Sequence, residues 1–355
     1  MDSRMLPKER LNELVARLGS GRRLVAPVLH DGALRWRTVE AGETITLDAG
    51  NTSDSPKAML LPQTEGMMRF GRACGHYADG HSSTPEETPT VLLGVRPCDA
   101  HSFLMLDRVF LEGRFRDAYY AARRKNTLVI VLACARPRST CFCHALNGGP
   151  YDRLGADLFM RDAGDAYLIE PVTEQGREVF RELADRLSPV DEAHRAAAAE
   201  IEDRAMQRLR PVKPVAGIKK VLQGLFDSPV WAEIAEKCVA CGTCTYLCPG
   251  CHCFTIEDRL RARDGERMRA WDSCMYPTFT LHASGHNPRP DQAARWRQRT
   301  MHKFAYLPEN VGMYGCVGCG RCIQACPVRL DIRDVIRRVR EVADQAVDGH
   351  GEAKA

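Results

Sequence analysis

Two runs of four cysteines share one spacing and carry the strongest chemical signal in the sequence. The runs consist of Cys238, Cys241, Cys244 and Cys248, and of Cys316, Cys319, Cys322 and Cys326. Each follows the pattern C-x2-C-x2-C-x3-C-P, which is typical of bacterial ferredoxins that hold [4Fe-4S] clusters through thiolates. Two complete copies therefore predict a protein that carries electrons. Zinc is the alternative, because C-x2-C pairs also occur in zinc sites.

In two-cluster ferredoxins the fourth cysteine of each run binds the cluster of the other run. We therefore predict that the first cluster is held by Cys238, Cys241, Cys244 and Cys326. The second cluster is then held by Cys316, Cys319, Cys322 and Cys248. Glycines in the two runs tolerate positive φ and let backbone N–H groups approach the sulfur atoms. The exchanged ligands would connect the two runs despite the long insertion between them.

Four further cysteines follow two apolar segments that are predicted to be buried strands. Cys98 comes after residues 91–95, and Cys134, Cys141 and Cys143 follow residues 127–133. If these strands are parallel neighbours, their carboxyl-terminal loops lie together, where α/β folds place their sites. Four thiolates would then converge, which is enough for a third [4Fe-4S] cluster. Buried free thiols, a zinc site and a redox-active thiol site are the alternatives.

The remaining cysteines give a weaker signal. Cys251, Cys253 and Cys274 are near the first run in sequence and are expected to pack around a cluster, although a ligand role stays open. Cys74 is predicted to be structural. The basic stretch 289–303 is interpreted as a solvated helix face, and it is the first place to look for contact with an acidic partner.

Length and composition fit a globular protein of about two domains. The 355 residues are 44% hydrophobic and 27% charged, with a net charge of +4. This small charge, without an aromatic and basic patch, argues against a nucleic-acid partner. Sixteen cysteines without a recognisable signal peptide favour a cytoplasmic protein with metal ligands over a disulfide scaffold. No apolar run approaches the length of a membrane span.

The hydrophobic pattern predicts an α/β domain over residues 1–212. Residues 6–18 have helical periodicity, and residues 23–29 and 34–39 predict a hairpin around Asp31-Gly32. The two buried strands flank a helical segment at 100–124, which indicates a strand–helix–strand unit. No G-x-G-x-x-G follows either strand, so no dinucleotide-binding fingerprint is present.

Residues 213–355 are predicted to form a mainly α-helical dicluster ferredoxin domain. Residues 218–235, 291–303 and 332–347 have helical patterns, and residues 256–260 indicate a short strand or turn. Helical segments between 173 and 209, broken near Ser188-Pro189, precede the boundary at the proline-containing stretch 211–214.

Several local motifs resemble those of a known family. They are Gly-Val-Arg-Pro-Cys-Asp-Ala-His (94–101), Ser-Thr-Cys-Phe-Cys (139–143), Trp-Asp-Ser-Cys-Met (271–275), Gly-His-Asn-Pro-Arg-Pro (285–290) and Arg-Gln-Arg-Thr-Met-His-Lys-Phe (297–304). With the two Cys-Pro runs, they resemble the 4Fe-4S dicluster subunits typified by the sulfhydrogenase beta subunit and the A subunit of anaerobic sulfite reductase. The first 90 residues add little to this resemblance.

The resemblance implies a subunit of a soluble multisubunit oxidoreductase. Such a chain would connect a flavin-containing NAD(P)H-oxidising subunit with a catalytic subunit, which is a [NiFe] hydrogenase or a sirohaem sulfite reductase. It also implies a C-terminal domain similar to the alpha-helical ferredoxins.

From the residues themselves we expect electrons to hop between the clusters. No general acid–base pair or nucleophilic triad is evident, so no substrate chemistry is predicted on this chain alone, and whether it is itself an enzyme stays open. The alternative is a reductase that acts directly on a sulfur compound at the N-terminal cysteine site.

Overall fold

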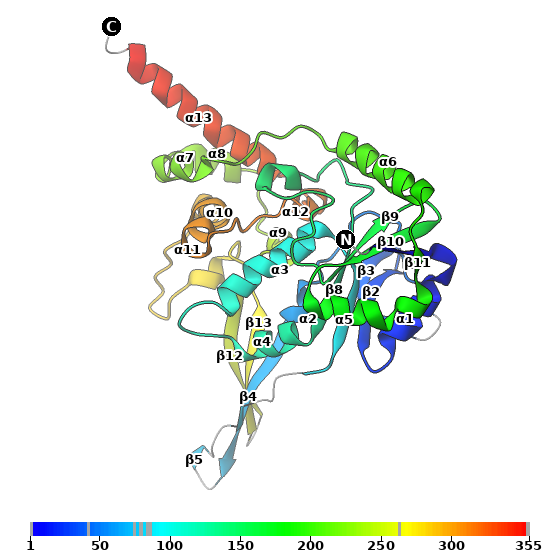
Figure 1. The fold of residues 1–355 in the computed structure, drawn as a ribbon. Coiled ribbons are helices and arrows are strands. Elements are labelled where there is room, and N and C mark those ends of the chain that lie inside the picture. The colour runs from blue at the N-terminus through cyan, green and yellow to red at the C-terminus, as the bar shows by residue number, and fades with distance from the viewer. Residues whose placement is uncertain are drawn as a thin grey trace. The chain divides into compact units, whose positions relative to one another are not determined.

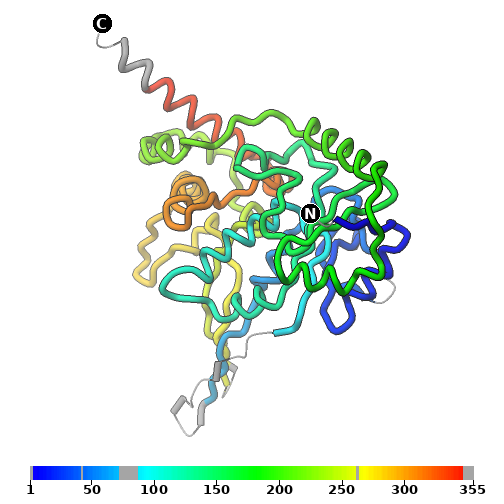
Figure 2. The backbone as a smooth tube through the Cα atoms, in the orientation of Figure 1, coloured from blue at the N-terminus to red at the C-terminus, as the bar shows by residue number. Residues whose placement is uncertain are grey.

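The structure is a computed structural model, and it describes residues 3–40, 43–73, 76–77, 81–82, 87–261 and 264–352. The chain forms two compact units, each built from separate segments. The first unit comprises Met1–Lys57, Glu86–Pro214 and Val317–Gly320, and the second comprises Ala58–Pro85, Val215–Cys316 and Arg321–Ala355. Figure 2 traces the path of the backbone through these segments. The segment Val317–Gly320 lies inside the second cysteine run, so this run contributes residues to both units.

The first unit is organised around an eight-stranded mixed sheet with the order β11-β1-β10-β9-β8-β7-β2-β3 (Figure 1). Its strands are β1 (Arg4–Pro7), β2 (Arg23–His30), β3 (Ala33–Thr38), β7 (Thr90–Val95), β8 (Thr127–Leu132), β9 (Leu158–Asp162), β10 (Ala166–Pro171) and β11 (Ser188–Pro189). The four central strands β2, β7, β8 and β9 are parallel. Every residue of β7 and β8 is buried, as expected for parallel strands covered on both faces.

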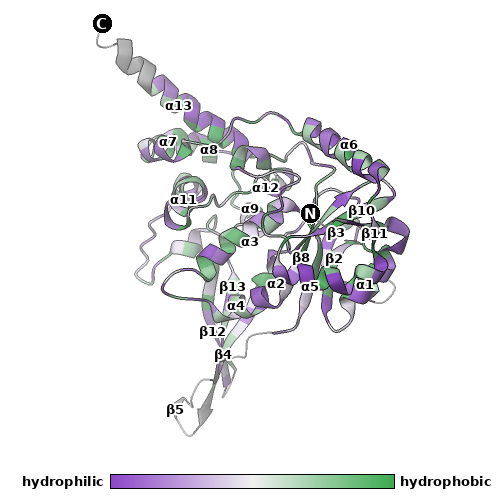
Figure 3. Cartoon of the chain, in the orientation of Figure 1, coloured by the Kyte–Doolittle hydropathy of each residue, from purple (hydrophilic) through white to green (hydrophobic). Residues whose placement is uncertain are grey.

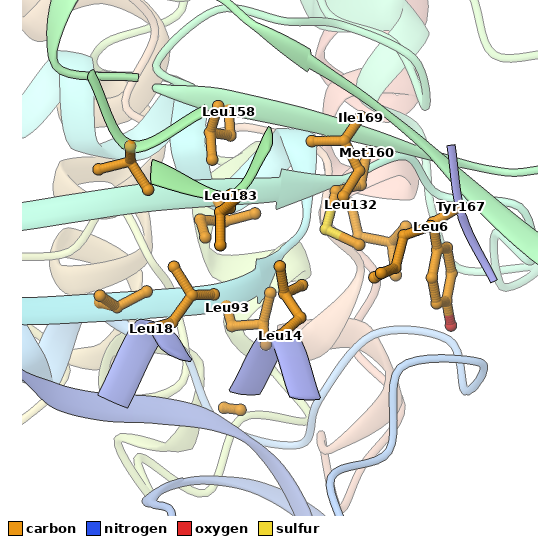
Figure 4. Packing of buried hydrophobic residues seen from close by; sticks show 14 of the residues in the cluster. Leu6, Leu14, Leu18, Leu93, Leu132, Leu158, Met160, Tyr167, Ile169 and Leu183 are labelled. Carbon is orange, nitrogen blue, oxygen red and sulfur yellow. The ribbon is translucent and has the colours of Figure 1, made fainter. Parts of the chain in front are cut away.

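Three helices of the first unit begin at side chains that accept hydrogen bonds from free backbone N–H groups. The helices are α1 (Leu11–Gly19), α3 (Pro97–Phe110), α4 (Ala118–Lys125), α5 (Glu174–Glu182) and α6 (Glu192–Arg208). The side chains of Asp117, Thr173 and Asp191 accept the N-terminal hydrogen bonds of α4, α5 and α6. Leu14 and Leu18 of α1 and Leu183 after α5 pack against one face of the sheet (Figure 4). This buried layer fixes the strands whose ends carry the cysteines.

The second unit combines helices with a five-stranded antiparallel sheet. Its strands are β4 (Thr64–Ala73), β5 (His76–Tyr77), β6 (His81–Ser82), β12 (Phe254–Arg261) and β13 (Asp264–Trp271). Its helices are α7 (Ile218–Gly224), α8 (Val230–Ala235), α9 (Thr243–Tyr246), α10 (Gln292–Met301), a π-helical turn at His302–Tyr306, α11 (Leu307–Val311), α12 (Arg321–Gln324) and α13 (Ile332–Glu352), while α2 (Lys57–Leu60) spans the junction of two segments.

Two features hold the second unit together across long sequence separations. Glu65 of β4 and Arg269 of β13 form a buried ion pair at 2.5 Å, which connects β4 with the distant strand β13 of the same sheet. Along α13, polar residues alternate with a buried apolar stripe (Figure 3). The stripe consists of Ile332, Val335, Ile336 and Val339, the spacing of one helix face.

Several sequence predictions are confirmed. The predicted hairpin is present, with β2 paired to β3. Its turn is at Asp31 and Gly32, whose φ angles of 50° and 70° suit a two-residue type I′ turn. The strands at 91–95 and 127–133 are parallel neighbours. The helical segments around 218–235, 291–303 and 332–347 are present.

Other predictions need correction. The helix predicted from residue 6 begins at Leu11, because residues 4–7 form β1, in which Leu6 pairs with Tyr167. Sheet pairing here overrides the local helical pattern. The description of the second part of the chain as mainly α-helical is not confirmed, because β12 and β13 pair with the distant strand β4. Cys74 lies outside the described residues.

In the part of the chain that the structure describes, no helix combines the length and apolar character needed to span a bilayer.

Candidate metal centres

The first cysteine run forms a tight loop that leads into α9. Ala240 and Gly242 have positive φ angles of 54° and 73°, so the chain turns sharply between Cys238 and Cys244. A Cβ atom at Gly242 would lie 2.5 Å from the Tyr276 hydroxyl oxygen, so a side chain is excluded there by close approach as well as by φ.

The four cysteines predicted for the first cluster line a single cavity. They are Cys238, Cys241, Cys244 and Cys326, and Cys322 lines the same cavity. The Gln292 side-chain amide donates a hydrogen bond to Cys238 Sγ at 3.0 Å, and the Leu330 N–H donates to Cys326 Sγ at 3.2 Å. N–H donors to thiolate sulfur are among the interactions that tune iron–sulfur clusters.

The walls of this cavity fit a group that carries hydrogen-bond acceptors. Trp296 and Arg299 both line it. Among the described residues, the buried donors Trp296 Nε1 and Arg299 Nε have no hydrogen-bond acceptor. Buried N–H groups are normally satisfied, so an acceptor inside the cavity is expected. The sulfur atoms of a [4Fe-4S] cluster accept such hydrogen bonds, and the residues present fit this group.

The second run repeats the loop of the first. Gly318 and Gly320, with φ angles of 65° and 73°, occupy the positions of Ala240 and Gly242. Of the cysteines predicted for the second cluster, Cys248, Cys316 and Cys322 belong to the second unit, whereas Cys319 belongs to the first. The convergence of these four side chains stays a prediction.

A buried lysine lies beside Cys248, the cysteine of the first run that is predicted to bind the second cluster. Lys303 Nζ donates hydrogen bonds to Cys248 Sγ at 3.2 Å and to the Gly315 carbonyl at 2.7 Å. Burial disfavours the charged amine, but attraction to the sulfurs of Cys248, Cys251 and Cys316 outweighs it and raises the pKa of Lys303. A permanent positive charge therefore lies at Cys248.

The cysteines predicted for the third site come together in the first unit. Cys98 follows β7 and Cys134 follows β8, and these parallel neighbours end at the same edge of the sheet. A single cavity is lined by Cys98, Cys134, Cys141, Cys143 and, in addition, Cys319 of the second run. Sequence analysis predicted the four and missed the fifth, because only the folded path of the second run brings Cys319 to this unit.

Backbone carbonyls and one arginine fix the shape of this third site. The buried Arg96 donates to the carbonyls of Leu47, Ala49 and Ala133 at 2.7, 2.5 and 3.2 Å. Asn51 Nδ2 lies within hydrogen-bonding distance of the Cys319 carbonyl at 3.4 Å and of Cys98 Sγ at 3.9 Å. The loops that carry the cysteines are therefore tied to one another by polar contacts.

The thiols of the third site resist deprotonation. Burial, together with the nearby Cys134, raises the pKa of Cys141 to about 11. Burial and the sulfurs of Cys134 and Cys141 raise the pKa of Cys143 to about 12. Reactive redox thiols have lowered pKa values, so these groups are poor nucleophiles at neutral pH. The raised pKa values therefore argue against a redox-active thiol site, and they are compatible both with buried free thiols and with metal ligands, because a bound metal displaces such protons and forms thiolates.

Comparison with known proteins agrees with this geometry. Residues 237–330, which include both cysteine runs, match the family model of the 4Fe-4S dicluster domain. Over 337 residues the chain is 34% identical to the protein named sulfhydrogenase 2 subunit beta from Pyrococcus furiosus. The aligned region covers 95% of this chain and 98% of that relative. The chain belongs to the sulfhydrogenase beta subunit family. It is an iron–sulfur electron-transfer subunit, and the resemblance inferred from the motifs is confirmed.

One interpretation of the dicluster domain was wrong. The basic stretch 289–303 is not a solvated helix face at its centre, because Arg295, Trp296, Arg299 and Lys303 are buried. Arg299 reaches the first cysteine loop, where it donates to the Cys244 carbonyl at 3.0 Å, whereas Arg295 donates to the Arg289 and Pro290 carbonyls. The spacing of Gln292, Arg295, Arg299 and Lys303 on one helix face was the signal that could have revealed this role.

Cys251, Cys253 and Cys274, the three cysteines near the first run in sequence, lie within the second unit. Arg299 Nη1 donates to Cys251 Sγ at 3.7 Å. Cys253 and Cys274 share a hydrogen bond at the open end of the β12–β13 hairpin, where Phe254 pairs with Trp271. Among the residues that the structure describes, no group of three or more His, Cys, Asp or Glu side chains could hold a single metal ion.

Proposed function

We propose that this chain relays electrons between a flavin-containing NAD(P)H-oxidising subunit and a [NiFe] hydrogenase catalytic subunit. The similarity that supports this assignment extends over almost the whole chain, to a relative whose name describes it as a sulfhydrogenase subunit. The observation that carries the relay role is the cavity of the first run, in which four cysteines and two buried donors without acceptors among the described residues surround one space.

The proposed relay contains three [4Fe-4S] clusters. Cys238, Cys241, Cys244 and Cys326 would hold the first cluster, and Cys316, Cys319, Cys322 and Cys248 would hold the second. Cys98, Cys134, Cys141 and Cys143 would hold the third, and their common cavity supports this set. Because Cys319 lines that cavity too, the second and third ligand sets include neighbouring residues, a suitable arrangement for electron transfer between them.

When bound, the clusters supply one-electron chemistry. The residues of this chain would hold them by thiolates, donate hydrogen bonds to their sulfurs and keep water away. Four protein thiolates at the third site suffice for a closed cluster, which favours a relay over direct reduction of a sulfur compound there. We propose no substrate site on this chain, a cytoplasmic location, and partners that do not include nucleic acid.

The test is anaerobic purification of the native complex, with subunit identification and analysis of iron, nickel, flavin and sirohaem. Nickel and flavin in stoichiometric amounts with this chain are the expected result. Sirohaem would instead assign the chain to a sulfite reductase. A chain that purifies alone, free of flavin, and reduces a sulfur compound would overturn the relay.

A further inference from the structure

One face of α10 and of the π-helical turn that follows it points hydrogen-bond donors at two cysteines of the first run, Cys238 and Cys248, which are predicted to bind different clusters. Gln292, Arg295, Arg299 and Lys303 recur every three or four residues, the spacing of a single helix face. Gln292, the first residue of α10, contacts Cys238, and Lys303 contacts Cys248 from the π-helical turn that follows. π-Helical turns frequently occur at functional sites, and here the turn carries the buried lysine.

The donor at Cys238 is neutral and held in one orientation. Arg295 donates from Nε and Nη2 to Gln292 Oε1 at 3.0 and 2.9 Å. Since the amide oxygen is occupied by the guanidinium, the NH₂ group must face Cys238. Arg295 is in turn fixed by the carbonyls of Arg289 and Pro290 at 3.1 and 3.2 Å.

The donor at Cys248 is charged. Lys303 is 4% exposed, and its ammonium group contacts Cys248 Sγ and the Gly315 carbonyl. A buried ammonium needs nearby negative charge, and thiolates of a cluster provide it. Arg299 donates to the Cys244 carbonyl at 3.0 Å and lines the cavity that Cys322 also lines, so its charge lies near cysteines predicted for both clusters.

A cluster gains one negative charge when it is reduced, so a fixed cation stabilises the reduced state more than the oxidised state. A neutral amide donor has the same effect more weakly, because charged hydrogen bonds are about twice as strong as neutral ones. Lys303 and Gln292 therefore act in the same direction with different strength, each on a different cysteine.

We propose that α10 and its π-helical turn set the two ferredoxin-type clusters at different reduction potentials. Lys303 raises the potential of the cluster bound by Cys248 above that of the cluster bound by Cys238, so electrons pass from the latter to the former. Lys303 and Gln292 are positioning residues in this account. The inference rests on the proposed iron–sulfur relay and its exchanged fourth ligands.

The experiment compares the wild type with Lys303→Met, Lys303→Arg and Gln292→Leu in the purified complex. Iron and acid-labile sulfide are measured first, so that loss of a cluster is distinguished from a change in its potential. Redox titration followed by electron paramagnetic resonance then gives the midpoint potential of each cluster. The matched control is Lys219→Met, since Lys219 forms an exposed ion pair with Glu309.

Lys303→Met is expected to lower the midpoint potential of the cluster bound by Cys248. At the wild-type midpoint its ratio of reduced to oxidised cluster should fall about tenfold, which is about 59 mV for a one-electron couple. Gln292→Leu should cause a smaller decrease in the midpoint potential of the cluster bound by Cys238. Lys303→Arg and Lys219→Met should leave the potentials of both clusters unchanged.

Unchanged potentials in an iron-replete Lys303→Met variant would overturn the proposal, as would an equal shift of both clusters. If Lys303→Met does not retain its iron, Lys303→Gln removes the charge while keeping a donor and is expected to shift the same cluster. A wild-type complex without iron and sulfide would contradict the relay itself, which is a separate failure.

Discussion

The two cysteine runs have the same spacing and the same pair of left-handed turns, but their surroundings differ. In the first run Cys241 is exposed and Val239 is 61% exposed, whereas Val317 and Cys319 of the second run are 5% and 8% exposed. The cysteine pattern thus determines how the loop turns, and the rest of the chain determines what the loop meets. The loop of the first run is accessible to solvent, and the loop of the second run lines a second cysteine cavity.

The same difference explains one residue choice. The first run has alanine at its first left-handed position, Ala240, and the second has Gly318 there. A Cβ atom on Gly318 would lie 2.5 Å from the backbone nitrogen of Cys143, and the Gly318 carbonyl accepts a hydrogen bond from Phe142 N–H at 2.8 Å. The second run therefore needs glycine for space, whereas the first needs only a tolerable φ.

Removal of iron should produce the largest contrast between the surroundings of the runs. Without clusters, Lys303 and Arg299 lose their counter-charges, and an unpaired buried charge costs about 3–5 kcal/mol. Arg96, at the third site, keeps its backbone carbonyl acceptors. Hydrogen exchange with mass spectrometry on anaerobic holo- and apoprotein should show α10 losing protection while β7 and β8 keep it. Equal loss in both segments would contradict the contrast.

Substitution at the two equivalent left-handed positions should give the next largest effect. Gly318→Ala forces a Cβ atom against backbone and should destabilise the protein by about 1–3 kcal/mol. Ala240→Gly is the matched control, and it should be nearly neutral, because relief of an unfavourable φ offsets the extra freedom of the unfolded chain.

Melting temperature and iron content, measured anaerobically for both variants, check this pair. Gly318→Ala should melt earlier and bind less iron, and Ala240→Gly should resemble the wild type. Equal behaviour of the two variants would mean that the loops have equivalent surroundings.

The smallest effect on stability is expected when the hydrogen bond between Tyr276 and the loop of the first run is removed. The Tyr276 hydroxyl donates to the Cys241 carbonyl at 3.3 Å. Tyr276→Phe removes this hydrogen bond and should lower stability by about 0.5 kcal/mol, near the low end for a single bond. Iron content should stay at the wild-type level, and chemical denaturation of the anaerobic protein checks both points. A loss as large as that of Gly318→Ala would remove the distinction between the loops.

Local patterns in the sequence predicted much of the fold around the third site. The apolar runs that became β7 and β8, and the cysteines after them, are local features with a known consequence in parallel sheets. The pairing of β4 with β13 could not be predicted in this way. It depends on contacts such as Glu65–Arg269, whose partners are far apart in sequence and polar, so they give no apolar pattern.

The cysteine loops were predictable from the sequence, and the environment of these loops was not. The spacing of Cys238, Cys241 and Cys244 reports the loop directly, and the cavity they line agrees with it. Basic residues such as Arg299 and Lys303 were interpreted as solvated because charged side chains are seldom buried without partners. Their partners here are cysteine sulfurs and carbonyls, which a hydropathy pattern does not reveal.

The most direct test of the central claim is the iron and acid-labile sulfide content of the anaerobically purified wild type and of Cys141→Ser, with Ser139→Ala in the same loop as control. Three clusters predict about twelve irons per chain in the wild type and in Ser139→Ala, and about eight in Cys141→Ser, with both ferredoxin-type clusters retained. An iron content that does not change in Cys141→Ser would contradict the three-cluster relay.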